Sequence, residues 1–165
     1  MAMDMFLVFK ASPPIEGETL DSKYKGDKGI DVLAWSWGES NSGSAHLGGG
    51  SGSGKVNVQD LSFTKYIDKA SCPLMDACSK GTHIDSAKLV VRKAGGKPLE
   101  YVVMTLTDVL VSSYSTGGSG GEDKLTENVT LNFAKVQVDY QIQKEDGSGE
   151  AGGNYGWDIP GNVAL

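Results

Sequence analysis

A glycine-rich segment supplies the pattern closest to a known chemical motif. Gly49, Gly54 and Lys55 have the G-x-x-x-x-G-K spacing of a phosphate-binding loop. The next residue is Val56, whereas that loop needs a serine or threonine to hold magnesium. The residues that follow predict a strand, not the helix whose N-terminus cradles the phosphate. A Gly/Ser tract produces this match by chance, so we do not expect a nucleotide site.

The histidines and cysteines do not form a metal or redox motif. His46 falls within the Gly/Ser segment and His83 follows a predicted helix, and neither has the H-E-x-x-H or Cys-x-x-Cys company of a metal site. Cys72 and Cys78 are six residues apart, which in a helix is about 9 Å of rise and exceeds the ~7 Å limit for a disulfide. We expect reduced thiols, structural or surface histidines, and no cofactor.

Carboxylates and serines are numerous, but their spacing indicates no catalytic pair. A glycosidase pair formed by distant carboxylates stays open, although nothing in the spacing supports it. The serines lack the G-x-S-x-G pattern in a strand–turn–helix setting. We therefore expect no enzyme and interpret the carboxylates as solvated surface. The acidic residues considered are Glu16, Glu18, Asp31, Asp85, Glu122, Asp123 and Glu127.

Length and charge restrict the class of protein. A chain of 165 residues predicts one domain, residues 1–165. The formal net charge of −6 disfavours a nucleic-acid partner, because phosphate backbones repel an acidic surface. No apolar run approaches the ~20 residues that span a bilayer. The apolar stretch 5–9 is too short for a cleavable signal peptide, so we expect a cytoplasmic product that a dedicated machine would have to export.

The elements that position these residues are mostly strands. Alternating or continuous apolar runs predict strands over 5–9, 30–37, 55–67, 87–93, 99–113 and 125–143. The apolar parity switches near Gln59–Asp60 and again near Ala134, which predicts a bulge or bend at each place. One helix is expected over 71–80, with Ser71 as N-cap and Gly81 at its end. This order predicts a small antiparallel β-barrel with one short helix on its side, or a sandwich.

The strand over 30–37 carries large apolar side chains on one face and small ones on the other. Leu33, Trp35 and Trp37 share a parity and should enter the core. Val32 and Ser36 then belong to the opposite, shallow surface. Because Trp35 and Trp37 alternate with small residues, we interpret them as core residues and not as a sugar-binding platform.

The strand over 99–113 is apolar on both faces. Val102, Met104, Leu106 and Leu110 share one parity, and Val103, Val109 and Val111 have the other. A strand of this kind is covered on both sides. In a chain with one short helix, the second cover is expected to be another subunit.

Three segments rich in glycine interrupt the strands, at 40–54, 115–121 and 145–156. The first holds six glycines and five serines in fifteen positions, too few apolar groups to fold alone, and is expected to be a long flexible loop. In the tail beyond 145, Trp157 and Ile159 are the residues able to anchor it.

Several stretches together resemble one known family. They are Ile30–Gly38, the Gly/Ser loop after it, Val56–Lys65, Val111–Ser115 with Gly117–Gly118, and Glu127–Phe133. From Met5 to about Trp157, in this order, they resemble the haemolysin-coregulated protein (Hcp) family, whose members form the tube of bacterial type VI secretion. No single motif is decisive, but the combination is specific.

The resemblance implies a fold similar to phage tail-tube proteins and a role in assembly. It implies a homohexameric ring, stacked rings that form a hollow tube inside a contractile sheath, a VgrG spike at the tip and effector proteins in the lumen. The protein would be cytoplasmic before firing and then secreted. In this interpretation Ser36 faces the lumen and its cargo.

The loop 40–54 becomes an arm between subunits in the same interpretation. Its contact residues are expected to be Ser44, His46, Leu47, Gly49 and Gly50. The alternative is a monomeric β-sandwich that binds carbohydrate through Trp35, Trp37 or Trp157. Solution mass separates the two.

Overall fold

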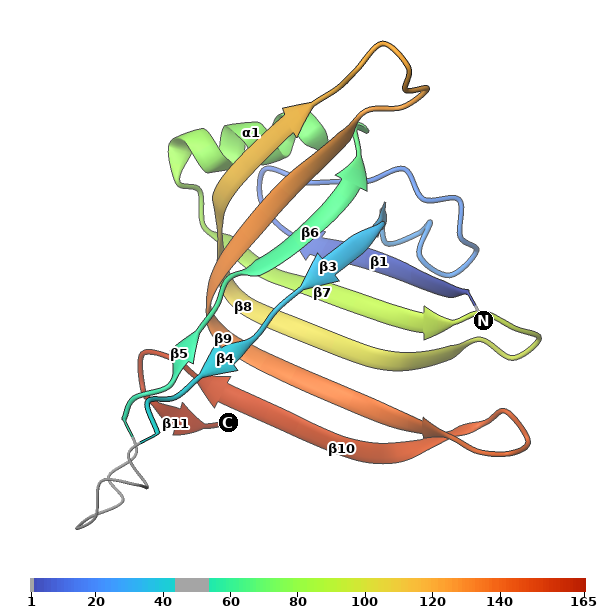
Figure 1. The fold of residues 1–165 in the computed structure, drawn as a ribbon, viewed down its shortest axis with the longest axis vertical. Helices are drawn as coiled ribbons and strands as arrows, with labels where there is room; N and C mark the ends of the chain where they lie inside the picture. Colours follow the sequence, from blue (N-terminus) through green and yellow to red (C-terminus); the bar gives the residue numbers. More distant parts are fainter. Residues whose placement is uncertain (1, 44–53) are drawn as a thin grey trace.

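The structure is a computed structural model that describes residues 2–43 and 54–165 (Figure 1). The described residues are mainly β with one helix, α1, as expected. The strands are β1 (Met3–Lys10), β2 (Ile30–Asp31), β3 (Ala34–Ser36), β4 (Glu39–Ser40), β5 (Asn57–Val58), β6 (Leu61–Tyr66), β7 (Ile84–Lys93), β8 (Leu99–Gly117), β9 (Thr126–Gln143), β10 (Gly149–Asp158) and β11 (Val163–Ala164), and α1 spans Ser71–Lys80.

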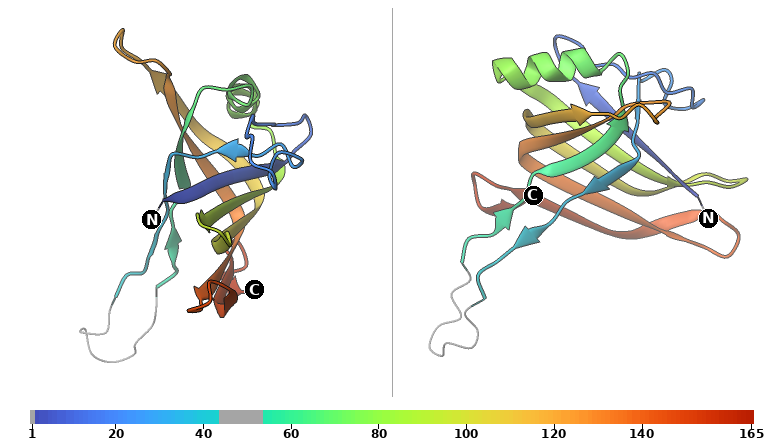
Figure 2. Two further views of the ribbon diagram at one scale, coloured as in Figure 1. Left: turned by 90° about the vertical axis from the view of Figure 1, so that its right-hand side faces the viewer. Right: turned by 45° about the horizontal axis from the view of Figure 1, so that its top comes forward.

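Strand β9 is the branch point of an antiparallel sheet. It pairs with β8 along nearly its whole length. On its other side the N-terminal part, Thr126–Leu131, pairs with β6, whereas the C-terminal part, Lys135–Gln143, pairs with β10. The long curved ribbons of β8 and β9 consequently run through the part of the sheet that contains β6 and the part that contains β10 (Figures 1 and 2).

The buried side chains of β8 and β9 switch from one parity to the other at the same level of the two strands. In β9 the buried residues shift parity between Phe133 and Val136, as the sequence predicts near Ala134. In β8 they shift between Leu106 and Val109, and these residues pair with Val136 and Phe133 respectively. Asp108 lies at the shift with φ 55°, in the left-handed region that an aspartate tolerates better than a branched residue. Both strands therefore bend together and keep their apolar side chains in one core.

This bend corrects the interpretation of 99–113 as a strand apolar on two faces. Met104, Leu106, Val109 and Val111 are all buried in the same cluster, because the extra residue at the bend returns the later valines to the core side. Val103 remains on the outer face.

That outer face is covered in part by the chain itself. Residues 11–29, here called the strap, place Tyr24 on Phe6 with ring centroids 4.7 Å apart. Tyr24, Phe6 and Val90 form a second buried cluster. Arg92 lies over the Phe6 ring, pairs with Asp21 of the strap, and pairs with Asp4 at 3.1 Å. The Arg92 hydrogen bond holds the pKa of Asp21 below its usual value.

The segment 30–36 crosses between two parts of the sheet. Val32 N donates to Met5 O of β1 at 2.9 Å, and Leu33 N donates to Thr64 O of β6 at 2.8 Å. The sheet is therefore bridged here, although its strand ladder is not closed into a continuous ring.

Because the chain changes partner at this point, alternation does not run through 30–37. Val32 is buried and Leu33 is 41% exposed, the reverse of the predicted faces. Trp35 and Trp37 pack against the core as predicted.

The break predicted near Gln59–Asp60 is present. β5 ends at Val58 and β6 begins at Leu61, whose side chain is buried together with those of Phe63 and Lys65.

Helix α1 has the predicted bounds and the predicted end. Gly81 adopts φ 62° and its N–H donates to Ala77 O. The N-cap is Ala70 instead of Ser71, and no side chain caps it. The Ser71 hydroxyl is used elsewhere: it donates to Glu127 at 2.8 Å and accepts the Asp68 N–H at 3.0 Å.

The glycine-rich tail forms a strand, which its composition does not predict. β10 pairs with β9 from Gly149 onward, and Trp157 and Ile159 pack against the core as anchors. A Cβ at Gly152 would lie 2.5 Å from the Tyr140 ring. Glycine is needed there because the aromatic side chain of the neighbouring strand occupies the space.

Lys65 and Glu127 form an ion pair in which both side chains are fully buried. Lys65 Nζ also contacts Asp68 Oδ1 at 2.7 Å, and Glu127 accepts hydrogen bonds from Ser71 and Tyr114. The cluster ties β6, β9, β8 and the start of α1 together. It also corrects the interpretation of Glu127 as a solvated surface residue.

Removing one partner of this pair leaves the other charge buried without compensation. Lys65→Met is expected to lower the free energy of unfolding by about 3–5 kcal/mol. Lys80→Met is the matched control: it breaks the exposed Lys80–Asp76 pair and should cost less than about 1 kcal/mol. Urea unfolding at one fixed chain concentration measures both changes, and equal effects would contradict this role of the buried pair.

Candidate functional site

The histidines, cysteines and carboxylates considered in the sequence do not form a metal-binding cluster among the described residues. No group of three or more His, Cys, Asp or Glu side chains there could hold a metal ion. His83 is exposed between α1 and β7, and Cys72 and Cys78 are free thiols. Ser44, His46, Leu47, Gly49 and Gly50 lie outside the described residues.

Ser36 lies on a surface made of small polar side chains. It is exposed on β3. Across the neighbouring strands it belongs to one row of directly paired residues, which continues with Ser62 of β6, Thr130 of β9 and Ser113 of β8. A second row, two residues along each strand, consists of Ala34, Thr64, Asn128 and Ser115. Successive residues of a strand point to opposite faces, so both rows lie on the face away from Leu61 and Phe63. No charged residue occurs in either row.

One half of this surface is fixed by hydrogen bonds and the other half is open. The Ser112 hydroxyl donates to Asp60 Oδ2 at 2.6 Å and is hydrogen-bonded to the Thr130 hydroxyl at 2.7 Å. Thr64 Oγ1 donates to Asn128 Oδ1 at 2.6 Å. Among the described residues, the Ser36 and Ser62 hydroxyls form no hydrogen bond. They line a shallow hollow of about 280 Å³ together with Thr64 and Asn128.

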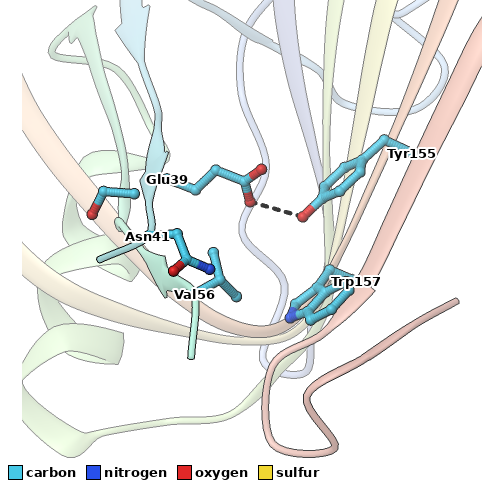
Figure 3. Close-up of a pocket in the computed structure, with 6 residues that line it drawn as sticks. Glu39, Asn41, Val56, Tyr155 and Trp157 are labelled. Carbon is cyan, nitrogen blue, oxygen red and sulfur yellow. Dashed lines mark hydrogen bonds between the residues drawn. The ribbon is translucent and has the colours of Figure 1, made fainter. Parts of the chain in front are cut away.

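A second concave site lies between strand β10 and the base of the 40–54 segment, where β4 and β5 lie (Figure 3). β4 and β5 pair with each other, and Asn41 Nδ2 donates to Gly54 O at 2.8 Å beyond them. Facing this base, β10 presents Tyr155 and Trp157, which lie on one face because they are two residues apart. The cavity between them has a volume of about 400 Å³. Its lining residues are Glu39, Ser40, Asn41, Val56, Tyr155 and Trp157.

A hydrogen bond joins the two sides of this cavity. Tyr155 Oη donates to Glu39 Oε2 at 2.8 Å, across 116 residues of sequence. Burial first, and the neighbouring Glu39 carboxylate second, raise the pKa of Tyr155 to about 12. The phenol is therefore neutral near pH 7. Trp157 Nε1 is buried and has no acceptor among the described residues.

The sequence does not predict this cavity. By composition 145–156 is a glycine-rich connection, and Trp157 is expected only as an anchor or a sugar contact. The alternation of Tyr155 and Trp157 between small residues was the available signal for a strand with one aromatic face. Nothing local indicates that Glu39 meets that face.

The helix of the described region, ten residues long, is too short and too polar to cross a membrane.

Comparisons with known proteins agree with this architecture. A family model described as "Type VI secretion system effector, Hcp" matches residues 6–140. Protein hcp1 of Pseudomonas aeruginosa is 62% identical over 165 residues, which is 99% of each chain.

Solved structures show the same fold over the whole chain. The crystal structure of Hcp1 from Salmonella typhimurium is 37% identical, with all of both chains covered and a TM-score of 0.79. A structure described as a type six secretion system protein is 29% identical and covers 99% of this chain and 100% of its own, with a TM-score of 0.91. The chain therefore belongs to the Hcp family of type VI secretion proteins.

Proposed function

We propose that the chain is the structural subunit of the type VI secretion inner tube. Six copies form a ring, rings stack into a hollow tube within the contractile sheath, and the VgrG spike caps the tube. Effector proteins are carried or chaperoned in the lumen. The chain is cytoplasmic before firing and is then secreted, and it needs no catalysis for this role.

Two open strand edges carry the ring proposal. β3, β6, the first part of β9 and the last part of β8 form a four-stranded layer. Among the described residues, β3 pairs only with β6 at one side, and residues 110–117 of β8 pair only with β9 at the other side. Unpaired N–H and C=O groups at a strand edge are a template for another chain. Two different edges on one layer suit a head-to-tail contact, which closes into a ring when the rotation between copies allows it.

The polar rows support the position of the lumen. If β3 of one copy continues the layer of the next, all copies turn the same face inward. The two rows that contain Ser36, Ser62 and Asn128 consist of small, uncharged side chains, whereas the opposite face is the core. α1 packs on the core side of this layer, where Leu74 and Ala77 share a cluster with Phe63, and this supports a position of α1 on the outside of the ring.

The first expected outcome concerns solution mass. Light scattering of the purified full chain should give about six times the 17.4 kDa chain mass, because each open edge is paired by a neighbouring copy. A compact particle of one chain mass at high concentration would contradict the ring and favour a monomeric binding module.

Ser36→Arg should impair retention of a co-produced effector while the ring mass stays unchanged, because a long charged side chain occupies the lumen face. Ser119→Arg is the matched control, since Ser119 is exposed on the hairpin between β8 and β9. Retention is measured by co-purification of that effector at equal ring concentration. Intact rings with unchanged retention would show that Ser36 is not a cargo contact.

Deleting residues 40–54 should weaken the stacking of rings more than it destabilises the subunit. The arm is proposed as a contact between subunits, and the core lies in other segments. Electron microscopy counts stacked rings, and thermal unfolding measures the subunit. Stacking at the wild-type level would argue against an assembly role for the arm.

A further inference from the structure

The cavity between the base of the arm and β10 has the chemistry of a cation site. It brings the carboxylate of Glu39 beside the aromatic rings of Tyr155 and Trp157 (Figure 3). We propose that it binds an organic cation, either an alkylammonium or a guanidinium group, over the two rings and against the carboxylate. Neither the proposed tube nor the cargo face requires such a site.

The aromatic rings elsewhere in the protein show the same preference. Arg92 lies 5.0 Å from the centre of the Phe6 ring, Lys93 lies 4.4 Å from that of Tyr101, and Lys124 lies 5.2 Å from that of Tyr66. Ring faces attract cations because their π-electrons concentrate negative potential there. Among the described residues, Tyr155 and Trp157 have no such partner, and the sequence of residues 44–53 contains no lysine or arginine.

The charge of the cavity suits a single positive group. The Tyr155 hydroxyl donates a hydrogen bond to Glu39 Oε2 and leaves Glu39 Oε1 without a hydrogen bond among the described residues. Glu39 forms no ion pair with a described Lys or Arg side chain. Since Tyr155 stays neutral and Ser40, Asn41 and Val56 are uncharged, Glu39 is the single acidic residue among the described lining residues. Asn41 Oδ1 is a further acceptor for an N–H group, because its Nδ2 is engaged with Gly54 O.

The size of the cavity limits the ligand. A volume of about 400 Å³ lies at the lower end of the range for small-molecule sites and admits a side chain of the size of arginine or lysine. The cation can come from a free small molecule or from a lysine or arginine presented by a second copy of the chain. The recognising chemistry is the same in both cases, so the experiment has an arm for each source.

In the first arm, N-acetyl-argininamide and N-acetyl-lysinamide are titrated into the full chain by calorimetry, with uncharged N-acetyl-norleucinamide as the comparison ligand. A free-ligand site gives saturable binding of the cationic amides that is weaker by about tenfold in Glu39→Gln. Glutamine keeps an acceptor for the Tyr155 hydroxyl, so the local fold is retained. Glu150→Gln is the matched control, because Glu150 is an exposed carboxylate on β10 outside this lining.

In the second arm, the masses of the wild-type protein, Glu39→Gln and Glu150→Gln are compared by light scattering at one concentration. A lower mass in Glu39→Gln alone identifies a second copy as the source of the cation. Equal binding of the norleucine amide, or unchanged binding and unchanged mass in Glu39→Gln, overturns the cation site. The wild-type mass tests the ring independently, so failure of one proposal is distinguishable from failure of the other.

Discussion

The structure depends on one constraint: β8 and β9 must change face at the same level. Leu106 pairs with Val136 and Val109 pairs with Phe133, so the extra residue in one strand is matched by the extra residue in the other. If only one strand had shifted, its later apolar side chains would face solvent, because a shift of one residue exchanges the two faces of a strand. The matched shift also allows β9 to take β6 as its partner before the bend and β10 after it.

The buried charges reinforce this arrangement near the start of β9. Lys65 of β6 and Glu127 of β9 lie side by side within the paired register, and Ser71 brings the start of α1 to the same point. An ion pair of this kind is weak evidence for added stability, since desolvation offsets much of the attraction. The ion pair instead specifies the register of β6 against β9. A slip of one strand against the other would bury one charge alone, which is more costly than any apolar mismatch nearby.

Features that depend on local patterns were predictable from the sequence, and features that depend on distant contacts were not. The bounds of α1, the break before Leu61 and the bend near Ala134 follow from side-chain periodicity and from Gly81. The faces of Val32 and Leu33 were predicted wrongly, because the chain exchanges β1 for β6 within a few residues and periodicity does not report a change of partner. The burial of Glu127, the cover provided by Tyr24 and the meeting of Glu39 with Tyr155 each need a residue far away in sequence. The exposed position of Ser36 agrees with its predicted side of the strand, and its contact with cargo stays a prediction.

The three partners of β9 have a mechanical consequence. A strand that is hydrogen-bonded to β8 along nearly its whole length, and to β6 and β10 on its other side, cannot leave the sheet without breaking its pairing with all three. Force applied to either end of β9 is therefore shared among the hydrogen bonds to three neighbours. The part of the sheet around β9 should consequently yield as one cooperative unit.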